Sequence, residues 1–181
     1  MRVVGIDPGL TATGYGVVEQ TGNRMTPLTW GVIRSNEETL AGRLGEIHLK
    51  LRDLITEQKP DLVAVEEIFL AKNPRSALLL GHARGVALLA AGLYGYPVRE
   101  YPANSVKQAV AGRGGASKKQ VEYMVFRLLG LSEQKMLPDA SDALAVAICC
   151  IMKQGLQPAN RGSVRKTNEA LLKVLAMQVK K

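Results

Sequence analysis

Carboxylates occur at three places in this chain where an unpaired negative charge is costly. Asp7 closes one apolar run, Glu66 and Glu67 close another, and Asp139 and Asp142 open an apolar helical segment. A carboxylate beside a buried strand end is destabilised by lost hydration and by like charges unless a cation compensates. Mg²⁺ and Mn²⁺ prefer oxygen ligands. If the strand ends and the helix start converge, these acids predict a divalent-metal site.

Each group of acids also has a simpler explanation when it is taken alone. The Asp-Pro-Gly run at 7–9 consists of ordinary turn residues. Asp139 is suited to cap a helix, and Asp142 is favourably placed toward a helix dipole. Glu66 and Glu67 would be unremarkable at a solvated strand end. Strand alternation sends these two glutamates to opposite faces, so only one can join Asp7, and the pattern does not decide which.

The positions of these acids depend on a series of strands and helices that the hydrophobic pattern predicts. We expect strands at 1–7, 14–19, 26–34, 61–66 and 97–101, and helices at 39–58, 74–93, 104–111, 117–129 and 138–152. Three strands in succession indicate an antiparallel meander, and the later alternation of strand and helix indicates parallel strands. The expected fold class is α/β, with a mixed five-stranded sheet flanked by helices.

Composition, the lengths of the apolar runs and the cysteines argue against a disordered, secreted or membrane-spanning chain. The chain has 181 residues, of which 46% are hydrophobic and 22% charged, which is typical of a globular domain rather than a disordered chain. The N-terminus lacks the apolar run of a secretory signal, and the apolar stretch at 83–95 is shorter than the ~20 residues of a membrane span. Cys149 and Cys150 are adjacent, so we expect buried, reduced thiols and a cytoplasmic protein.

The positive charge is concentrated in two segments. The formal net charge is +8; residues 72–127 hold nine basic and two acidic residues, and residues 153–181 hold seven and one. A basic surplus predicts an anionic partner without identifying it. We expect one domain over residues 1–152, followed by a basic tail at 153–181 that is flexible or forms a short helix.

Four segments together resemble the RuvC family of Holliday junction resolvases: GIDPGLTATGYGV, DLVAVEEIFLAKNPRSALLLGHARGVALLAA, VKQAVAGRGGASKKQV and DASDALAVAI. The similarity extends over about residues 1–152. It implies a ribonuclease-H-like fold, which agrees with the predicted order of elements. The resemblance also places the four catalytic, metal-binding acids of the family on Asp7, Glu66, Asp139 and Asp142.

The same resemblance separates the two neighbouring glutamates and identifies basic residues of the site. In the family motif the glutamate lies three residues before a phenylalanine, here Phe69, which favours Glu66 over Glu67. The active-site lysines of the family match Lys107 and Lys118.

The implied reaction is metal-assisted hydrolysis of a phosphodiester. Two Mg²⁺ ions per active site, with Mn²⁺ able to substitute, would activate a water molecule and stabilise the leaving 3′-oxygen. Lys118 would neutralise the cleaved phosphate or assist the leaving group. The resemblance further implies ligatable 5′-phosphate and 3′-hydroxyl ends, a homodimer that cuts two strands of a four-way junction symmetrically, and coupling to a RuvA–RuvB branch-migration complex.

Contacts to the DNA backbone are expected from the basic middle of the chain, because phosphate contacts provide affinity with little sequence information. The candidate DNA-binding residues are Phe69, Lys72, Arg75, Lys107, Arg113, Lys118 and Lys119. Phe69 either stacks on an opened base or packs in the core. Two other functions remain open: a ribonuclease-H-type nuclease acting on another substrate, and a junction-binding scaffold without catalytic activity.

Overall fold

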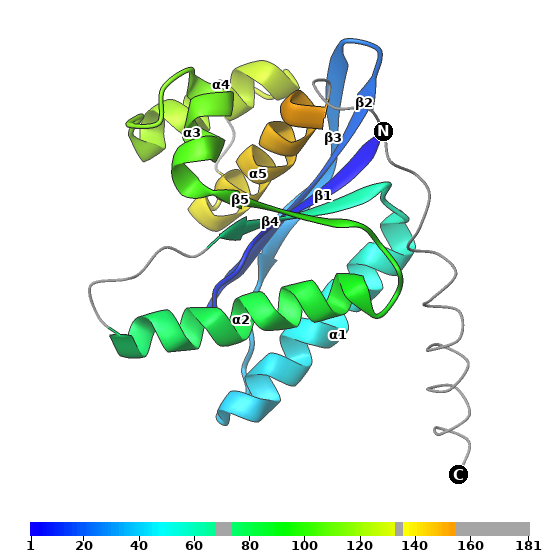
Figure 1. The fold of residues 1–181 in the computed structure, drawn as a ribbon, viewed down its shortest axis with the longest axis vertical. Helices are drawn as coiled ribbons and strands as arrows, with labels where there is room; N and C mark the ends of the chain where they lie inside the picture. Colours follow the sequence, from blue (N-terminus) through cyan, green and yellow to red (C-terminus); the bar gives the residue numbers. More distant parts are fainter. Residues whose placement is uncertain (68–73, 133–135, 155–181) are drawn as a thin grey trace.

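The computed structural model describes residues 1–67, 74–132 and 136–154 as a mixed sheet covered by helices on both faces (Figure 1). The ten elements predicted from the sequence are present, and their ends differ from prediction by no more than two residues. The strands are β1 (Arg2–Asp7), β2 (Thr13–Thr21), β3 (Arg24–Ile33), β4 (Leu62–Glu67) and β5 (Val98–Pro102). The helices are α1 (Leu40–Gln58), α2 (Pro74–Gly92), α3 (Ala103–Ala111), α4 (Lys118–Leu129) and α5 (Pro138–Gln154).

The first strand lies at the centre of the sheet, whose order is β3-β2-β1-β4-β5. β1 pairs antiparallel with β2 and parallel with β4, while β5 pairs parallel with β4. The predicted combination of a meander with parallel strands is therefore confirmed. Parallel pairing brings the carboxyl ends of β1 and β4 to the same edge of the sheet, where Asp7 and Glu66 lie.

The two faces of the sheet are covered by different helices. In Figure 1, α3, α4 and α5 lie on one side of the sheet, and α1 and α2 lie on the other. Val3 and Val18 pack in one hydrophobic cluster with residues of α3, α4 and α5. Val4 and Val17 point the opposite way and pack with residues of α1 and α2. This alternation determines which side chains at the strand ends face α5.

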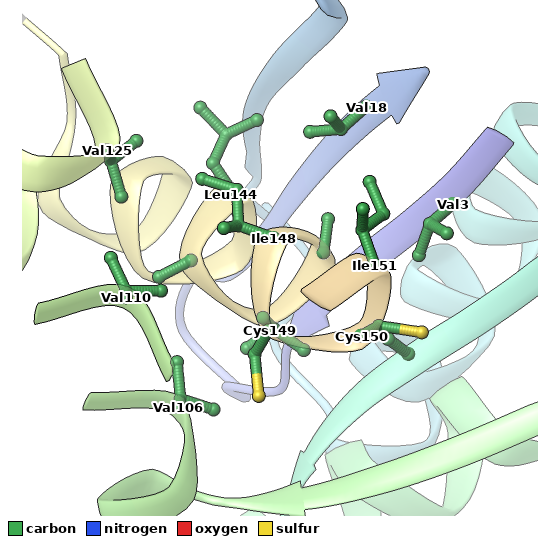
Figure 2. Close-up of a cluster of buried hydrophobic side chains, with 14 of the residues drawn as sticks. Val3, Val18, Val106, Val110, Val125, Leu144, Ile148, Cys149, Cys150 and Ile151 are labelled. Carbon is green, nitrogen blue, oxygen red and sulfur yellow. The ribbon is translucent and has the colours of Figure 1, made fainter. Parts of the chain in front are cut away.

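The buried centre of the molecule is α5, which follows the sheet closely (Figure 2). Between Ala140 and Ile151, every residue of this helix except Asp142 is buried. The sheet beneath it carries glycines where side chains would obstruct the helix. A Cβ atom on Gly5 would overlap the backbone oxygen of Ala143. The missing side chains thus allow α5 to lie directly on β1 and β2.

Further expectations from the sequence concern the cysteines, membrane-spanning helices and residues outside the described ranges. Cys149 and Cys150 are free and buried in α5, as expected. Within residues 1–67, 74–132 and 136–154, no helix has the length and hydropathy of a membrane-spanning segment. Phe69, Lys72 and the tail beyond residue 154 lie outside the described residues.

Candidate active site

Asp7 and Glu66 are brought side by side by the pairing of β1 with β4. Ile6 is in register with Val65, so the next residue of each strand lies at the same level. Burial, followed by the charge of Glu66 and then that of Asp142, raises the pKa of Asp7 from 3.8 to about 8. Burial, followed by the charge of Asp142, also raises the pKa of Glu66. The interaction between the two carboxyl groups raises the pKa of Asp7 further and opposes the rise at Glu66, so it favours the protonated form of Asp7.

Strand parity distinguishes Glu66 from Glu67. Leu62 and Ala64 pack in the cluster with α5, and Glu66 continues that alternate series of β4. On β1, Asp7 continues the series of Val3 and therefore points to the same face of the sheet. Glu67 belongs to the opposite series, although it also contributes to the wall of the pocket at this edge. The register thus groups Glu66 with Asp7, a choice that the sequence pattern alone left open.

The start of α5 brings two further acids to the same edge. A Cβ atom on Gly14 would overlap the backbone oxygen of Asp139, so this glycine lets the first turn of α5 contact β2. The charges of Asp142 and Asp139 both contribute to the raised pKa of Asp7. Packing of α5 on the glycines of the sheet therefore brings Asp142 to the acids of the strand ends. Asp139 acts on Asp7 through its charge but is not among the residues that line the pocket they share.

The N-terminus of α4 positions a lysine against this acidic group. The hydroxyl of Ser117 accepts a hydrogen bond from the backbone N–H of Gln120, whose side chain accepts one from the backbone N–H of Ser117. This capping box fixes the first turn of the helix. Lys118, the first residue of α4, donates a hydrogen bond from Nζ to Oδ2 of Asp142 at 3.0 Å. That bond, followed by the charge of Asp142, raises the pKa of Lys118.

These charged groups share one open pocket of about 330 Å³. Its acids are Asp7, Glu66, Glu67 and Asp142, and its cations are Lys107 and Lys118. The remaining wall is largely apolar and is formed by Pro8, Leu80, Ala103, Val106, Val121 and Ala145. The pocket thus combines carboxylate oxygens with cations that could contact a phosphate.

The donor set fits a divalent cation, although the side chains are arranged around other partners. Within the three described ranges, no group of three His, Cys, Asp or Glu side chains forms a ready-made metal cluster. Burial beside Glu66 favours a proton on Asp7, and Asp142 pairs with Lys118. All the candidate ligands are carboxylates, the donors that Mg²⁺ and Mn²⁺ prefer. A cation would take over the charge compensation that the proton and Lys118 now provide.

The expected DNA-binding residues divide into separate groups. Lys107 and Lys118 line the acidic pocket, whereas Arg113 and Lys119 line a second hollow. Arg75 is exposed in the first turn of α2. The second hollow includes Tyr123, which is 54% exposed and was not among the residues predicted from the sequence. Its spacing of four residues from Lys119 could have placed it on the same face of a helix.

Comparison with known proteins extends over nearly all of the described structure. The model of the family described as "Crossover junction endodeoxyribonuclease RuvC" matches residues 3–150. A relative with that name from Desulforamulus reducens is 49% identical over 150 residues, which cover 82% of this chain and 92% of the relative. Another from Actinobacillus succinogenes is 47% identical over 171 residues, covering 93% and 90% of the two chains.

Solved structures agree with the sequence comparison. Thermus thermophilus RuvC in complex with a Holliday junction substrate superposes with a TM-score of 0.81 at 37% identity, covering 86% of this chain and 96% of that one. The yeast mitochondrial Holliday junction resolvase has a TM-score of 0.64 at 12% identity, covering 95% and 85%, which supports the fold alone. By its sequence matches and its fold, the chain belongs to the RuvC family of crossover junction endodeoxyribonucleases.

Proposed function

We propose that this chain resolves Holliday junctions in recombination and DNA repair, by making paired symmetric nicks in two strands of a four-way DNA junction. The observation that carries the proposal is the convergence of Asp7, Glu66 and Asp142 with Lys118 in one pocket. Such carboxylates bind divalent cations, and lysines attract DNA phosphates. The relatives named as crossover junction endodeoxyribonucleases and the similar junction-bound structure support this choice of substrate.

In the proposed reaction the acids hold the metal and the lysines position the phosphate. Asp7, Glu66, Asp139 and Asp142 would bind two Mg²⁺ ions, with Mn²⁺ able to substitute. When bound, the metal supplies an activated water molecule and stabilises the leaving 3′-oxygen. Lys118 neutralises charge on the cleaved phosphate once it leaves Asp142, and Lys107 attracts the strand to the pocket. The products are a 5′-phosphate and a 3′-hydroxyl, which a ligase can rejoin.

A second copy of the chain supplies the second nick, because a two-fold junction suits a two-fold dimer. The exposed face of α2 supports this proposal. Leu78 and Leu89 are 68% and 51% exposed, and Gly81 and Gly85 lie between them without neighbours that a Cβ atom would meet. Their spacing of three or four residues places them on one face of the helix. An apolar face of this kind favours close packing against another subunit.

The biological setting follows from the same proposal. The proposal assigns residues 1–152 to the nuclease domain and the basic residues 153–181 to a tail, although the first two of these, Lys153 and Gln154, belong to α5. Buried, free Cys149 and Cys150 support a reducing compartment, the cytoplasm. A RuvA–RuvB branch-migration complex would deliver the junction to the dimer.

The direct test is cleavage of a synthetic four-way junction labelled on each arm, in the presence of Mg²⁺. We expect nicks at symmetric positions in two opposite strands, with ends that ligase seals. Cleavage of RNA–DNA hybrids with intact junctions would favour a ribonuclease-H-type nuclease instead. Cleavage that persists in EDTA would exclude the metal mechanism. Asp7→Asn should abolish cutting and retain binding, whereas a scaffold would behave identically with and without this change.

The neighbouring glutamates provide a matched pair for the assigned metal ligand. Glu66→Gln removes a carboxylate on the face that carries Asp7, and Glu67→Gln removes one from the opposite face. We expect Glu66→Gln to slow junction cleavage by at least about 100-fold, since even an outer-shell partner of a ligand is worth 10–100-fold. Glu67→Gln should retain cleavage within about tenfold of the unmodified chain. The reverse order of effects would contradict the assignment of Glu66.

A further inference from the structure

A second hollow lies beside the active-site pocket and has a different chemistry. Its volume is about 320 Å³, which lies within the range of small-molecule sites. The lining residues are Ala111, Arg113, Lys119, Gln120, Tyr123 and Met124. The lining thus combines two cations, a tyrosine and two apolar side chains, and none of the lining residues is acidic. An anionic ligand with an apolar, flat portion matches this lining.

The cations of the hollow are available for such a ligand. Within the three described ranges, neither Arg113 nor Lys119 forms an ion pair, and both are exposed. Gln120 is already used in the capping box with Ser117. Tyr123 is 54% exposed, so its ring is accessible to a ligand. Arg113, Lys119 and Tyr123 are therefore the groups that a ligand would contact.

The hollow and the active-site pocket lie on two sides of one helical turn. Lys118 and Val121 line the active-site pocket, whereas Lys119 and Gln120, the two residues between them, line the hollow. Successive residues of a helix rise by only about 1.5 Å and rotate by about 100°. A polynucleotide strand that contacts Lys118 and crosses the first turn of α4 therefore passes close to Lys119 and the hollow.

We propose that the hollow binds a nucleotide of the junction strand close to the cleaved phosphate. Arg113 and Lys119 contact its phosphate, and the ring of Tyr123 stacks on its base. The base supplies the flat apolar surface that the apolar side chains and the ring require, and stacking on an aromatic ring tolerates any base. The inference rests on the proposed junction cleavage and adds a positioning residue outside the pocket of acids.

The test measures stacking at single positions of a junction bound to the full-length Asp7→Asn chain, which the proposed mechanism expects to bind without cutting. A 2-aminopurine probe is placed at successive nucleotides around the cleavage position, because its fluorescence is quenched when it stacks. We expect quenching at one position, retained by Tyr123→Phe and lost in Tyr123→Leu. Junction affinity should fall by about 5- to 100-fold in Tyr123→Leu, the range for loss of one stacked base.

Salt dependence tests the two cations independently of stacking. Arg113→Gln and Lys119→Gln should each lower the slope of log affinity against log salt by about 0.7 to 0.9, the value for one lost phosphate contact. Arg127→Gln is the matched control, because Arg127 is also exposed on α4 and does not line the hollow. It should leave both the slope and the 2-aminopurine signal unchanged.

The outcomes separate this inference from the proposed function. If the unmodified chain cuts junctions while Tyr123→Leu keeps full affinity and the same quenching, the inference is wrong and the proposed function stands. A hollow that binds an acidic protein segment instead would give that result. If the unmodified chain neither binds nor cuts junctions, both proposals fail together. Tyr123 is exposed, and an unchanged thermal midpoint in Tyr123→Leu would exclude unfolding as the cause of any loss.

Discussion

Replacing Asp7 by asparagine should remove a strong pH dependence from the stability of the metal-free protein. The pKa of Asp7 is raised from 3.8 to about 8 in the folded protein, by burial first and then by Glu66 and Asp142. At pH values between 3.8 and about 8, Asp7 therefore keeps its proton in the folded chain and has lost it in the unfolded chain. The free energy of unfolding therefore falls as the pH rises through this interval, by at most about 1.4 kcal/mol per pH unit.

The expected decrease in the free energy of unfolding is large compared with the stability of a typical domain. Between pH 6 and pH 8 it amounts to about 2 kcal/mol, against the 5–15 kcal/mol typical of a native protein. Asparagine has the shape of aspartic acid and does not ionise, so Asp7→Asn should be more stable than the unmodified chain at pH 8 in EDTA. Saturating Mg²⁺ should also flatten the curve of the unmodified chain, because the cation replaces the proton on the carboxylates.

The measurement is urea denaturation in EDTA at a series of pH values. The single tryptophan, Trp30, packs against the core cluster and provides a fluorescence signal for unfolding. Glu67→Gln is the matched control, since it removes a carboxylate from the same strand end on the opposite face, and it should retain the pH dependence. Parallel curves for the unmodified chain and Asp7→Asn between pH 6 and pH 8 would refute the reasoning.

Two further predictions concern α5. Gly14→Ala places a Cβ atom against the backbone oxygen of Asp139, so it should lower the free energy of unfolding by about 1–3 kcal/mol and slow junction cleavage. The matched control is Gly45→Ala in α1, where a Cβ atom meets nothing, and it should stabilise the chain by up to about 1 kcal/mol. Equal urea midpoints for Gly14→Ala and Gly45→Ala would contradict the close packing of α5 on Gly14. Burial raises the pKa of Cys149 and Cys150 to about 11, so a thiol reagent at pH 8 should label them only after unfolding. Rapid labelling of the native chain would show that α5 opens.

The elements of the fold were predictable because their signals are local. The apolar spacing in 40–58 and the stop at Lys59-Pro60 identify α1 without knowledge of any other segment. The choice between Glu66 and Glu67 was not local, because it depends on the pairing of Val3 with Leu62 across the sheet. A period of two residues assigns alternate faces without saying which face meets α5. The family resemblance selected Glu66 from its distance to a phenylalanine.

The contacts within the site were less predictable than its residues. Nothing in the sequence indicated that Lys118 would pair with Asp142, because the two residues belong to different helices. The close approach of α5 depends on Gly5 and Gly14 at the particular points where the helix crosses the strands. Tyr123 was missed because its role depends on a hollow that only the packed helices form.

The order of the elements along the chain has a consequence for the time at which nuclease activity can arise. Ribosomes make Asp7 early and α5, with Asp139 and Asp142, after all five strands. Until α5 docks on the glycines of the sheet, the set of acids is incomplete, and so is the core around Val3. On the proposed mechanism, a nascent chain, or one truncated before α5, therefore lacks the assembled cluster and should leave nearby DNA intact. Cutting should begin only when the whole domain has folded.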